Sequence, residues 1–138
     1  MKPHKYSFEL KNDLSELKTL YRHLNKFGQV SGLSEACITD VNICLDELFT
    51  NIVSYGFADD LEHIISFTIG LDNHELTLTI VDDGKPFNPL EKKDPNPPHD
   101  LIDVRIGGLG IHIVKKLMDA ISYQRKFNKN KLTIKKFI

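Results

Sequence analysis

Residues 34–55 read SEACITDVNICLDELFTNIVSY, and this stretch decides the fold class. Ser34 is a typical helix-capping residue, so it predicts a helix that runs from there to about Tyr55. Four apolar residues recur at helical spacing along it: Val41, Leu45, Leu48 and Ile52. Because a helix with one apolar stripe buries that stripe against another layer, this side of the helix should face a sheet.

The segments on either side of this helix supply the other elements. Alternating or β-rich residues predict strands at 5–10, 62–70, 75–82, 121–127 and 131–137, the last two joined around Asn128-Lys129-Asn130. Helical spacing predicts one further helix from Asp13 and another from residues 107–110 to about Asp119. This order predicts an α+β fold over residues 1–138: a two-layer α/β sandwich whose mixed, mainly antiparallel sheet carries the helices on one face.

Composition and charge exclude several classes of protein. The chain has 138 residues, of which 41% are hydrophobic and 27% charged, and its formal net charge is -1. A charge this close to zero gives no reason to expect nucleic-acid binding. No apolar run is long enough to cross a bilayer, and we see no signal peptide. Cys37 and Cys44 lie two helical turns apart, too far to bridge, so we expect buried thiols in a reducing cytoplasm.

Glu47 and Asn51 are the first candidates for chemistry. Because they are four residues apart on the predicted helix, their side chains stack on one face beside the apolar stripe. A carboxylate there can accept a proton from a hydroxyl group, and an amide oxygen is a hard ligand suited to Mg²⁺. A solvated polar face is the alternative, and the spacing alone favours it, since such pairs are common.

Residues 81–87, VDDGKPF, form the second candidate site, where a hydrophobic strand gives way to a loop. A carboxylate at a strand end can accept the exocyclic amine of adenine, and a glycine beside it lets a flat base approach the backbone. Alternation places Asp82 on the same face as Ile80, so we assign the base contact to Asp82 rather than Asp83. An Asp-Gly turn without a ligand is the alternative.

The third signal is the sequence GGLG at 107–110, which ends a proline-rich loop of roughly 20 residues. Glycines at a helix start leave backbone N–H groups available for an anion, and Arg105 adds positive charge. The chain has neither the GxGxxG of a Rossmann site nor the GxxxxGKS/T of a P-loop. A flexible glycine hinge is the alternative. We also predict that residues 86–106 are mobile without nucleotide and become protected from hydrogen exchange when ATP and Mg²⁺ bind.

Taken in this order and spacing, the three signals resemble the N, G1 and G2 boxes of the GHKL ATPases, which have the Bergerat ATP-binding fold. That superfamily includes gyrase, Hsp90, MutL and sensor histidine kinases, and the resemblance extends from about residue 5 to residue 138. Residues 108–119, GLGIHIVKKLMD, closely resemble the corresponding helix of bacterial anti-sigma-factor serine kinases of the RsbW and SpoIIAB type.

The resemblance implies a role for each motif. Glu47 would be the general base, and Asn51 would hold the Mg²⁺ that bridges the phosphates of ATP. Asp82 would bind the adenine amine, with Gly84 admitting the base. The remaining contacts to the nucleotide would come from Arg105, which lies in an ATP lid at about 84–107, and from Gly108, Leu109, Gly110 and Thr133. Thr133 would be a second adenine contact, and the others would meet the phosphates.

The resemblance also implies a function and partners. The chain would be an ATP-dependent protein serine kinase that phosphorylates a STAS-type anti-anti-sigma protein, binds a sigma factor and forms a homodimer. The alternative is a regulatory module that holds ATP and a partner protein with little or no kinase activity. Pro86 replaces the second glycine of the usual DxGxG, and Tyr55 stands where a histidine is frequent. Neither departure touches Glu47 or Asn51, whose joint presence favours the enzyme.

Overall fold

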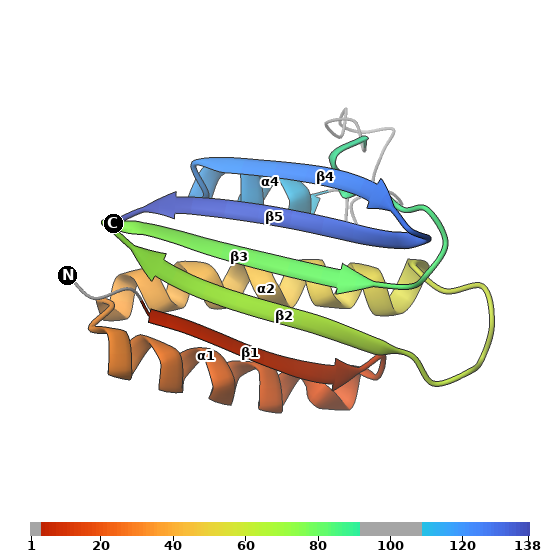
Figure 1. The fold of residues 1–138 in the computed structure, drawn as a ribbon, viewed down its shortest axis with the longest axis horizontal. Coiled ribbons are helices and arrows are strands. Elements are labelled where there is room, and N and C mark those ends of the chain that lie inside the picture. The colour runs from red at the N-terminus through yellow and green to blue at the C-terminus, as the bar shows by residue number, and fades with distance from the viewer. Residues whose placement is uncertain (1–3, 92–108) are drawn as a thin grey trace.

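The computed structural model describes residues 4–91 and 109–138, and its elements follow the predicted order. The strands are β1 (His4–Lys11), β2 (Ile64–Asp72), β3 (Glu75–Asp82), β4 (Ala120–Lys126) and β5 (Lys129–Phe137) (Figure 1). The helices are α1 (Leu17–Ser31), α2 (Glu35–Tyr55) and α4 (Leu109–Leu117), with short 3-10 helices η1 (Leu14–Glu16) and η2 (Pro89–Glu91).

The strands form one sheet in the order β1-β2-β3-β5-β4. Each of the pairings is antiparallel, so the described residues contain no parallel component of the sheet that we expected to be mixed. β3 lies beside β5 although α4 and β4 come between them in the chain. This crossing matters for function, because it brings the end of β3 against the beginning of β5.

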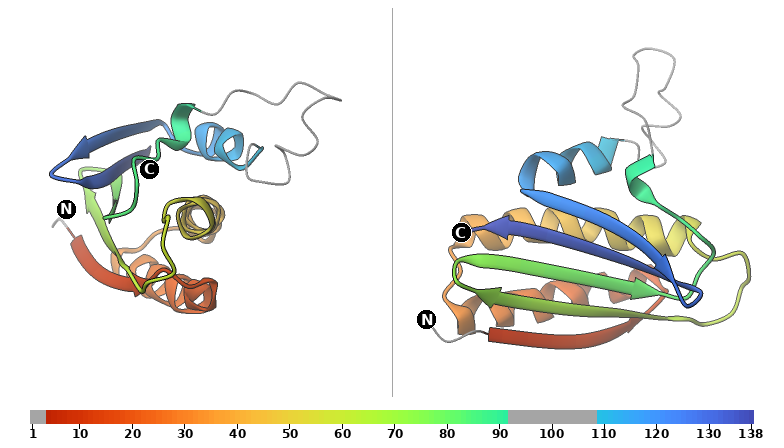
Figure 2. Two further views of the ribbon diagram at one scale, coloured as in Figure 1. Left: turned by 90° about the vertical axis from the view of Figure 1, so that its right-hand side faces the viewer. Right: turned by 45° about the horizontal axis from the view of Figure 1, so that its top comes forward.

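The three helices lie on one face of the sheet, which confirms the predicted two-layer sandwich (Figure 2). The predicted stripe of α2 is fully buried against the sheet, together with the inward-facing residues of the central strands: Val41, Leu45, Leu48, Ile52, Phe67, Ile69, Leu78 and Ile80. α2 starts as predicted, since the Ser34 hydroxyl accepts the N–H of Cys37 at 3.1 Å. The buried thiols of Cys37 and Cys44 are free, also as predicted.

The turn between β4 and β5 differs from the prediction. Phe127 and Asn128 have φ values of 53° and 59°, so the hairpin turns on these two residues alone. β5 therefore begins at Lys129, and Asn130 lies inside the strand, opposite Asp82 of β3. Our expectation that Asn130 belongs to the turn was wrong, because a two-residue turn with left-handed backbone needs no third residue.

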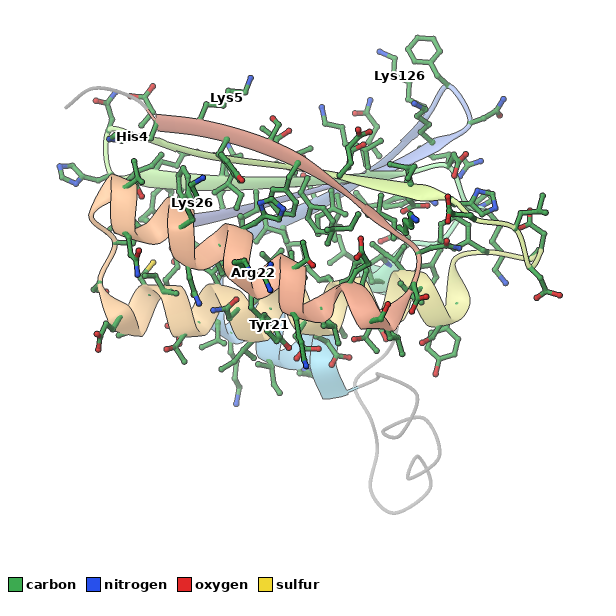
Figure 3. The ribbon with its side chains drawn as sticks, turned by 90° about the horizontal axis from the view of Figure 1, so that it is seen from below. His4, Lys5, Tyr21, Arg22, Lys26 and Lys126 are labelled. Atoms are coloured by element: carbon green, nitrogen blue, oxygen red, sulfur yellow. The ribbon has the colours of Figure 1, made fainter. Side chains whose placement is uncertain are left out.

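Positive charge gathers on the outer side of α1 despite a net charge near zero. Lys18, Arg22 and Lys26 are exposed and four residues apart, which places them in a row along the helix. Figure 3 shows Arg22 and Lys26 on α1 and Lys5 on the edge strand β1. A net charge near zero therefore does not mean that charge is evenly distributed over the surface.

No helix in the described part of the chain is both long and apolar enough to cross a membrane.

Candidate functional site

Three polar side chains are buried in the described part of the chain, and all three line one pocket. Asn51 is 3% exposed, and Asp82 and Asn130 are each 4% exposed. They reach the pocket from α2, β3 and β5 respectively. Because burying a polar group costs free energy unless it is hydrogen-bonded, their convergence marks this pocket as the candidate site.

The rest of the pocket wall is mainly apolar. The pocket encloses about 290 Å³ of empty space, its open mouth included. Apart from the three buried polar residues, it is lined by Leu48, Ile52, Ile80, Phe87, Pro89, Tyr123 and Leu132. Apolar walls with a few fixed polar groups are typical of small-molecule sites, and this lining suits a flat apolar ring with a polar edge.

The predicted pair on α2 is brought together. The Asn51 amide nitrogen donates to Glu47 Oε1 at 3.3 Å, and Glu47 itself is half-buried. Because the nitrogen is the donor, this bond does not use the amide oxygen, which keeps its capacity to bind a cation. Within residues 4–91 and 109–138 no three His, Cys, Asp or Glu side chains cluster to hold a metal ion. One amide oxygen nevertheless suits Mg²⁺, which usually keeps waters and takes its other ligands from phosphates.

Asp82 lines the pocket, and one oxygen of its carboxylate is held by hydrogen bonds. Oδ1 accepts two hydrogen bonds, from the N–H of Gly84 and from the Asn130 side-chain nitrogen, each at 2.9 Å. Among the described residues Oδ2 accepts none, so it is the oxygen that remains for a ligand. Burial raises the pKa of this carboxyl, and the bonds from Asn130 and Gly84 pull the pKa back down.

Asn130 is the site residue that the sequence did not reveal. Its Oδ1 accepts the Tyr123 hydroxyl and the N–H of Phe87, and its Nδ2 donates to the Lys85 carbonyl at 2.8 Å as well as to Asp82. The side chain thus joins β3, β4 and the loop after β3. Register counting would have found it only once the two-residue turn at Phe127 and Asn128 was known.

The loop after β3 is tied down at the position of the unexpected proline. Lys85 and Phe87, which flank Pro86, both bond to the Asn130 side chain. Arg125 donates to the Gly84 carbonyl at 2.7 Å, and this bond holds the backbone just before Lys85. Proline suits this position because it fixes its own φ and has no N–H to satisfy. Where the usual DxGxG motif has a flexible second glycine, this chain has Pro86 in a loop that hydrogen bonds hold in one conformation.

Gly84 is required by close packing against another loop. A Cβ at this position would lie 2.2 Å from the Gly56 carbonyl oxygen, a backbone atom. The N–H of Lys85 donates to that same oxygen at 2.8 Å. Access for a flat base is the reason for this glycine that we predict from the sequence. The structure adds a second reason, which is contact between the end of β3 and the end of α2.

A histidine strengthens the same contact between loops. The His63 ring lies between two carboxylates, with Nδ1 at 3.0 Å from Asp83 Oδ1 and Nε2 at 2.7 Å from Asp59 Oδ1. The bond to Asp59, followed by the bond to Asp83, raises the pKa of His63. Its ring also stacks on Phe57 with centroids 4.4 Å apart. Asp83, the acid that we did not assign to the base, therefore has a structural partner.

Thr133 does not line the pocket, so the geometry does not support its predicted contact with adenine. Side chains alternate along a strand, and Asn130 and Leu132 of β5 face the pocket. Thr133 consequently faces the other side of the sheet, where it lies opposite Thr79 and Ser122. We had assigned Thr133 from its place on the last strand without knowing the register of that strand.

Two of the four predicted phosphate contacts fall outside the described residues. Arg105 and Gly108 lie there, as does most of the lid predicted at about 84–107. Leu109 and Gly110 form the first turn of α4, as the glycine motif predicted. That helix packs against α2, the helix that carries Glu47 and Asn51. α4 therefore lies in the same helical layer as α2, beside the helix that carries the candidate catalytic residues.

A comparison with protein families agrees with this geometry. A model described as the histidine kinase-like ATPase domain matches residues 10–136, which include α2, β3 and β5. The chain belongs to this family. The matched range contains the buried polar residues Asn51 of α2, Asp82 of β3 and Asn130 of β5.

Relatives of this histidine kinase-like ATPase domain are named as kinases. The chain is 33% identical over 94 residues to the serine/threonine-protein kinase BtrW of Bordetella bronchiseptica, which covers 68% of this chain and 66% of BtrW. It is 28% identical over 91 residues to the serine-protein kinase RsbW of Bacillus subtilis, which covers 63% of this chain and 57% of RsbW. The chain thus spans less than two thirds of the length of either relative.

Solved structures confirm the fold of the histidine kinase-like ATPase domain. The crystal structure of the RsbU and RsbW domains of Rv1364c from Mycobacterium tuberculosis is similar with a TM-score of 0.66 and 13% identity, over 97% of this chain and 32% of that one. The SiaB-SiaC complex of Pseudomonas aeruginosa is similar with a TM-score of 0.56 and 13% identity, over 96% of this chain and 89% of that one.

Proposed function

We propose that this chain is an ATP-dependent protein serine kinase that binds Mg²⁺-ATP beside α2. The observation that carries the proposal is the convergence of Asn51 and Asp82, since an amide from α2 and a carboxylate from β3 line one pocket. Those are the groups that a site needs to hold a metal-bound phosphate chain at one end and an adenine ring at the other. The similarity to BtrW and RsbW supports protein serine phosphorylation as the reaction.

The adenine ring would enter the apolar pocket with its amino group toward Asp82. Oδ1 of this carboxylate is already occupied by the Gly84 N–H and by Asn130, which leaves Oδ2 to accept the amine. The apolar walls, including the paired residues Ile80 and Leu132 of the sheet, would pack against the ring. A charge-assisted hydrogen bond in such a buried place is worth about 1.5–3 kcal/mol.

The phosphates would extend along α2 toward the first turn of α4. Asn51 would hold Mg²⁺ through its amide oxygen, and the metal ion would neutralise charge on the phosphates. The backbone N–H groups of Gly108, Leu109 and Gly110 would bind phosphate oxygens at the helix start. Arg105 would add a positive charge from the lid. The role of Asn51 agrees with the direction of its bond to Glu47.

Transfer would then follow from position and one proton acceptor. The oxygen of a serine on the partner attacks the γ-phosphorus, the bond from that phosphorus to the bridging oxygen breaks, and ADP leaves. Glu47 accepts the proton of the serine hydroxyl. Its bond to Asn51 would keep the carboxylate next to the metal-bound phosphates. Phosphoryl transfer asks for little more than such positioning and charge neutralisation.

The partners in this proposal come from the resemblance to anti-sigma-factor kinases. The phosphorylated protein would be a STAS-type anti-anti-sigma factor, and the chain would also bind a sigma factor, as a cytoplasmic homodimer. The second candidate function is that of a regulatory module, which would bind ATP in the same pocket without efficient phosphoryl transfer. The hydrogen bond between Glu47 and Asn51 favours the kinase. A module that only binds ATP has no need for a carboxylate bonded to the residue that would hold the metal ion.

The test combines a binding titration with a transfer assay. ATP should bind measurably with Mg²⁺ and much more weakly with EDTA, and label from γ-labelled ATP should pass to a serine of a STAS-type protein. Binding without transfer to any such protein would favour the regulatory module. Absence of Mg²⁺-dependent ATP binding would overturn both functions together.

A further inference from the structure

The amide of Asn130 has only one orientation that satisfies its neighbours. Its oxygen accepts from the Tyr123 hydroxyl and from the N–H of Phe87, and its nitrogen donates to the Lys85 carbonyl. Turning the amide over would set the nitrogen against two donors and the oxygen against a carbonyl. The network therefore fixes the donor side of Asn130 toward Asp82, at 2.9 Å from Oδ1.

This orientation decides what Asp82 can offer to a ligand. Since Asn130 and the Gly84 N–H both donate to Oδ1, the carboxylate is held by that oxygen, and Oδ2 is left to accept from a ligand. Both donors stabilise the ionised form, which accepts hydrogen bonds and donates none. An ionised carboxylate attracts the 6-amino group of adenine and repels the 6-oxo group of guanine or hypoxanthine. Without Asn130, the carboxyl would lose one of the two donors that favour its ionised form, while the opposing effect of burial on its pKa would remain.

We infer that Asn130 is a positioning residue that sets the selectivity of this site for 6-amino over 6-oxo purine nucleotides. The inference rests on the proposed ATP-binding function and adds to it the residue that enforces the choice of base. Asn130 acts through Asp82, to which it is bonded, and through the loop at 85–87, whose backbone it holds. Tyr123 acts one step further away, by holding the oxygen of Asn130.

The experiment measures the affinity of Mg²⁺-ATP and of Mg²⁺-ITP for the whole chain. Inosine differs from adenosine at the 6-position and at the neighbouring ring nitrogen, so the ratio of the two Kd values reports on the groups that face Asp82. We expect the wild type to prefer ATP and Asn130→Ala to reduce the ITP-to-ATP ratio of Kd values by about tenfold, the effect of one hydrogen bond to a charged group. A purely structural loss would weaken both nucleotides equally and leave the ratio unchanged.

Two further variants keep the test decisive. Tyr123→Phe removes one of the donors to the Asn130 oxygen while it keeps the ring in the pocket wall, and we expect a reduction of the ratio by about threefold. It decides the question if Asn130→Ala does not fold. Ser122→Ala is the control, because Ser122 is the neighbour of Tyr123 and is exposed on the other face of the sheet. Its ratio should equal that of the wild type.

The outcomes separate this inference from the proposed function. A wild type that binds ATP and ITP equally, or variants that keep the wild-type ratio, would overturn the role of Asn130 and leave ATP binding intact. A wild type that binds neither nucleotide would overturn the proposed function and this inference together. A ratio that falls in Asn130→Ala and Tyr123→Phe, and stays constant in Ser122→Ala, is the result that we expect.

Discussion

The two polar pairs of the site differ in how they are built. Glu47 and Asn51 are four residues apart on α2, and the helix alone brings them to 3.3 Å. Asp82 and Asn130 come from different strands and meet at 2.9 Å only because β3 and β5 are neighbours in the sheet. The first pair is a product of local structure and the second a product of topology. A change in the sheet could therefore remove the base site while it leaves the α2 pair in place.

The largest expected effect belongs to the local pair. Glu47→Gln should slow phosphoryl transfer by roughly 10²–10⁴-fold, the usual contribution of a general base, while ATP affinity stays nearly intact. The lower end of that range fits a loose transition state, which needs less help from a base. Single-turnover phosphorylation of a STAS-type protein, run beside an ATP titration, measures both quantities.

Asn51→Ala separates the two members of that pair. It should weaken Mg²⁺-ATP binding and transfer together, since Asn51 acts through the metal ion. Asn42→Ala is a matched control, because Asn42 is an amide on the same helix whose bond goes to Asn25 of α1. Wild-type transfer by Glu47→Gln would refute the general-base role and favour the regulatory module.

The second effect falls on the topological pair. Asp82→Asn should weaken ATP binding by about 10- to 100-fold, because the amide would turn an NH₂ group toward the adenine amine. The amide oxygen can still accept the bonds from Gly84 and Asn130, so the fold should persist. Calorimetric titration of the variant with Mg²⁺-ATP measures the loss, and an affinity equal to that of the wild type would contradict the assignment.

The same variant should change the pH dependence of stability. Burial raises the pKa of Asp82 in the folded chain above its ordinary value of 3.8. Between these two pKa values the unfolded chain is ionised while the folded chain keeps its proton, so stability falls as pH rises through that window. Below the unfolded pKa the cost is absent. Without nucleotide, Asp82→Asn should therefore gain stability over the wild type as pH rises, which denaturant unfolding at several pH values can measure.

The contrast between the pairs explains how far the sequence could go. Helical spacing and capping predicted α2 and its buried stripe, because those depend on neighbours within two turns of the chain. Alternation placed Asp82 correctly on the face of Ile80. Asn130 and Thr133 were misassigned because their places depend on the exact turn of a hairpin, and one residue of shift exchanges the two faces of a strand. The contact of Gly84 with Gly56 likewise joins loops that are distant in the sequence, and no motif in either segment predicts it.

A third, smaller effect tests that distant contact. Gly84→Ala should lower the free energy of unfolding by about 1–3 kcal/mol, since its Cβ would lie 2.2 Å from a backbone oxygen that cannot move aside cheaply. Gly70→Ala is the matched control, because the nearest atom to its Cβ would be the His4 carbonyl oxygen at an ordinary 3.7 Å. Denaturant unfolding of both variants measures the difference. Equal stability of the two would show that the loops at 56 and 84 are not held together.

The smallest expected effect concerns Thr133, and it tests the register on which the base site depends. Thr133→Val removes a hydroxyl from the outer face of the sheet, opposite Thr79 and Ser122, so ATP affinity should stay within about twofold and stability within about 0.5 kcal/mol. Its neighbour Leu132 lines the pocket, and Leu132→Val should weaken ATP binding by a few-fold through the loss of one CH₂ group, worth about 0.8 kcal/mol. Titration of both variants with Mg²⁺-ATP compares adjacent residues that face opposite sides. If Thr133→Val lost affinity and Leu132→Val did not, β5 would be paired one residue out of register, and Asn130 could not face Asp82.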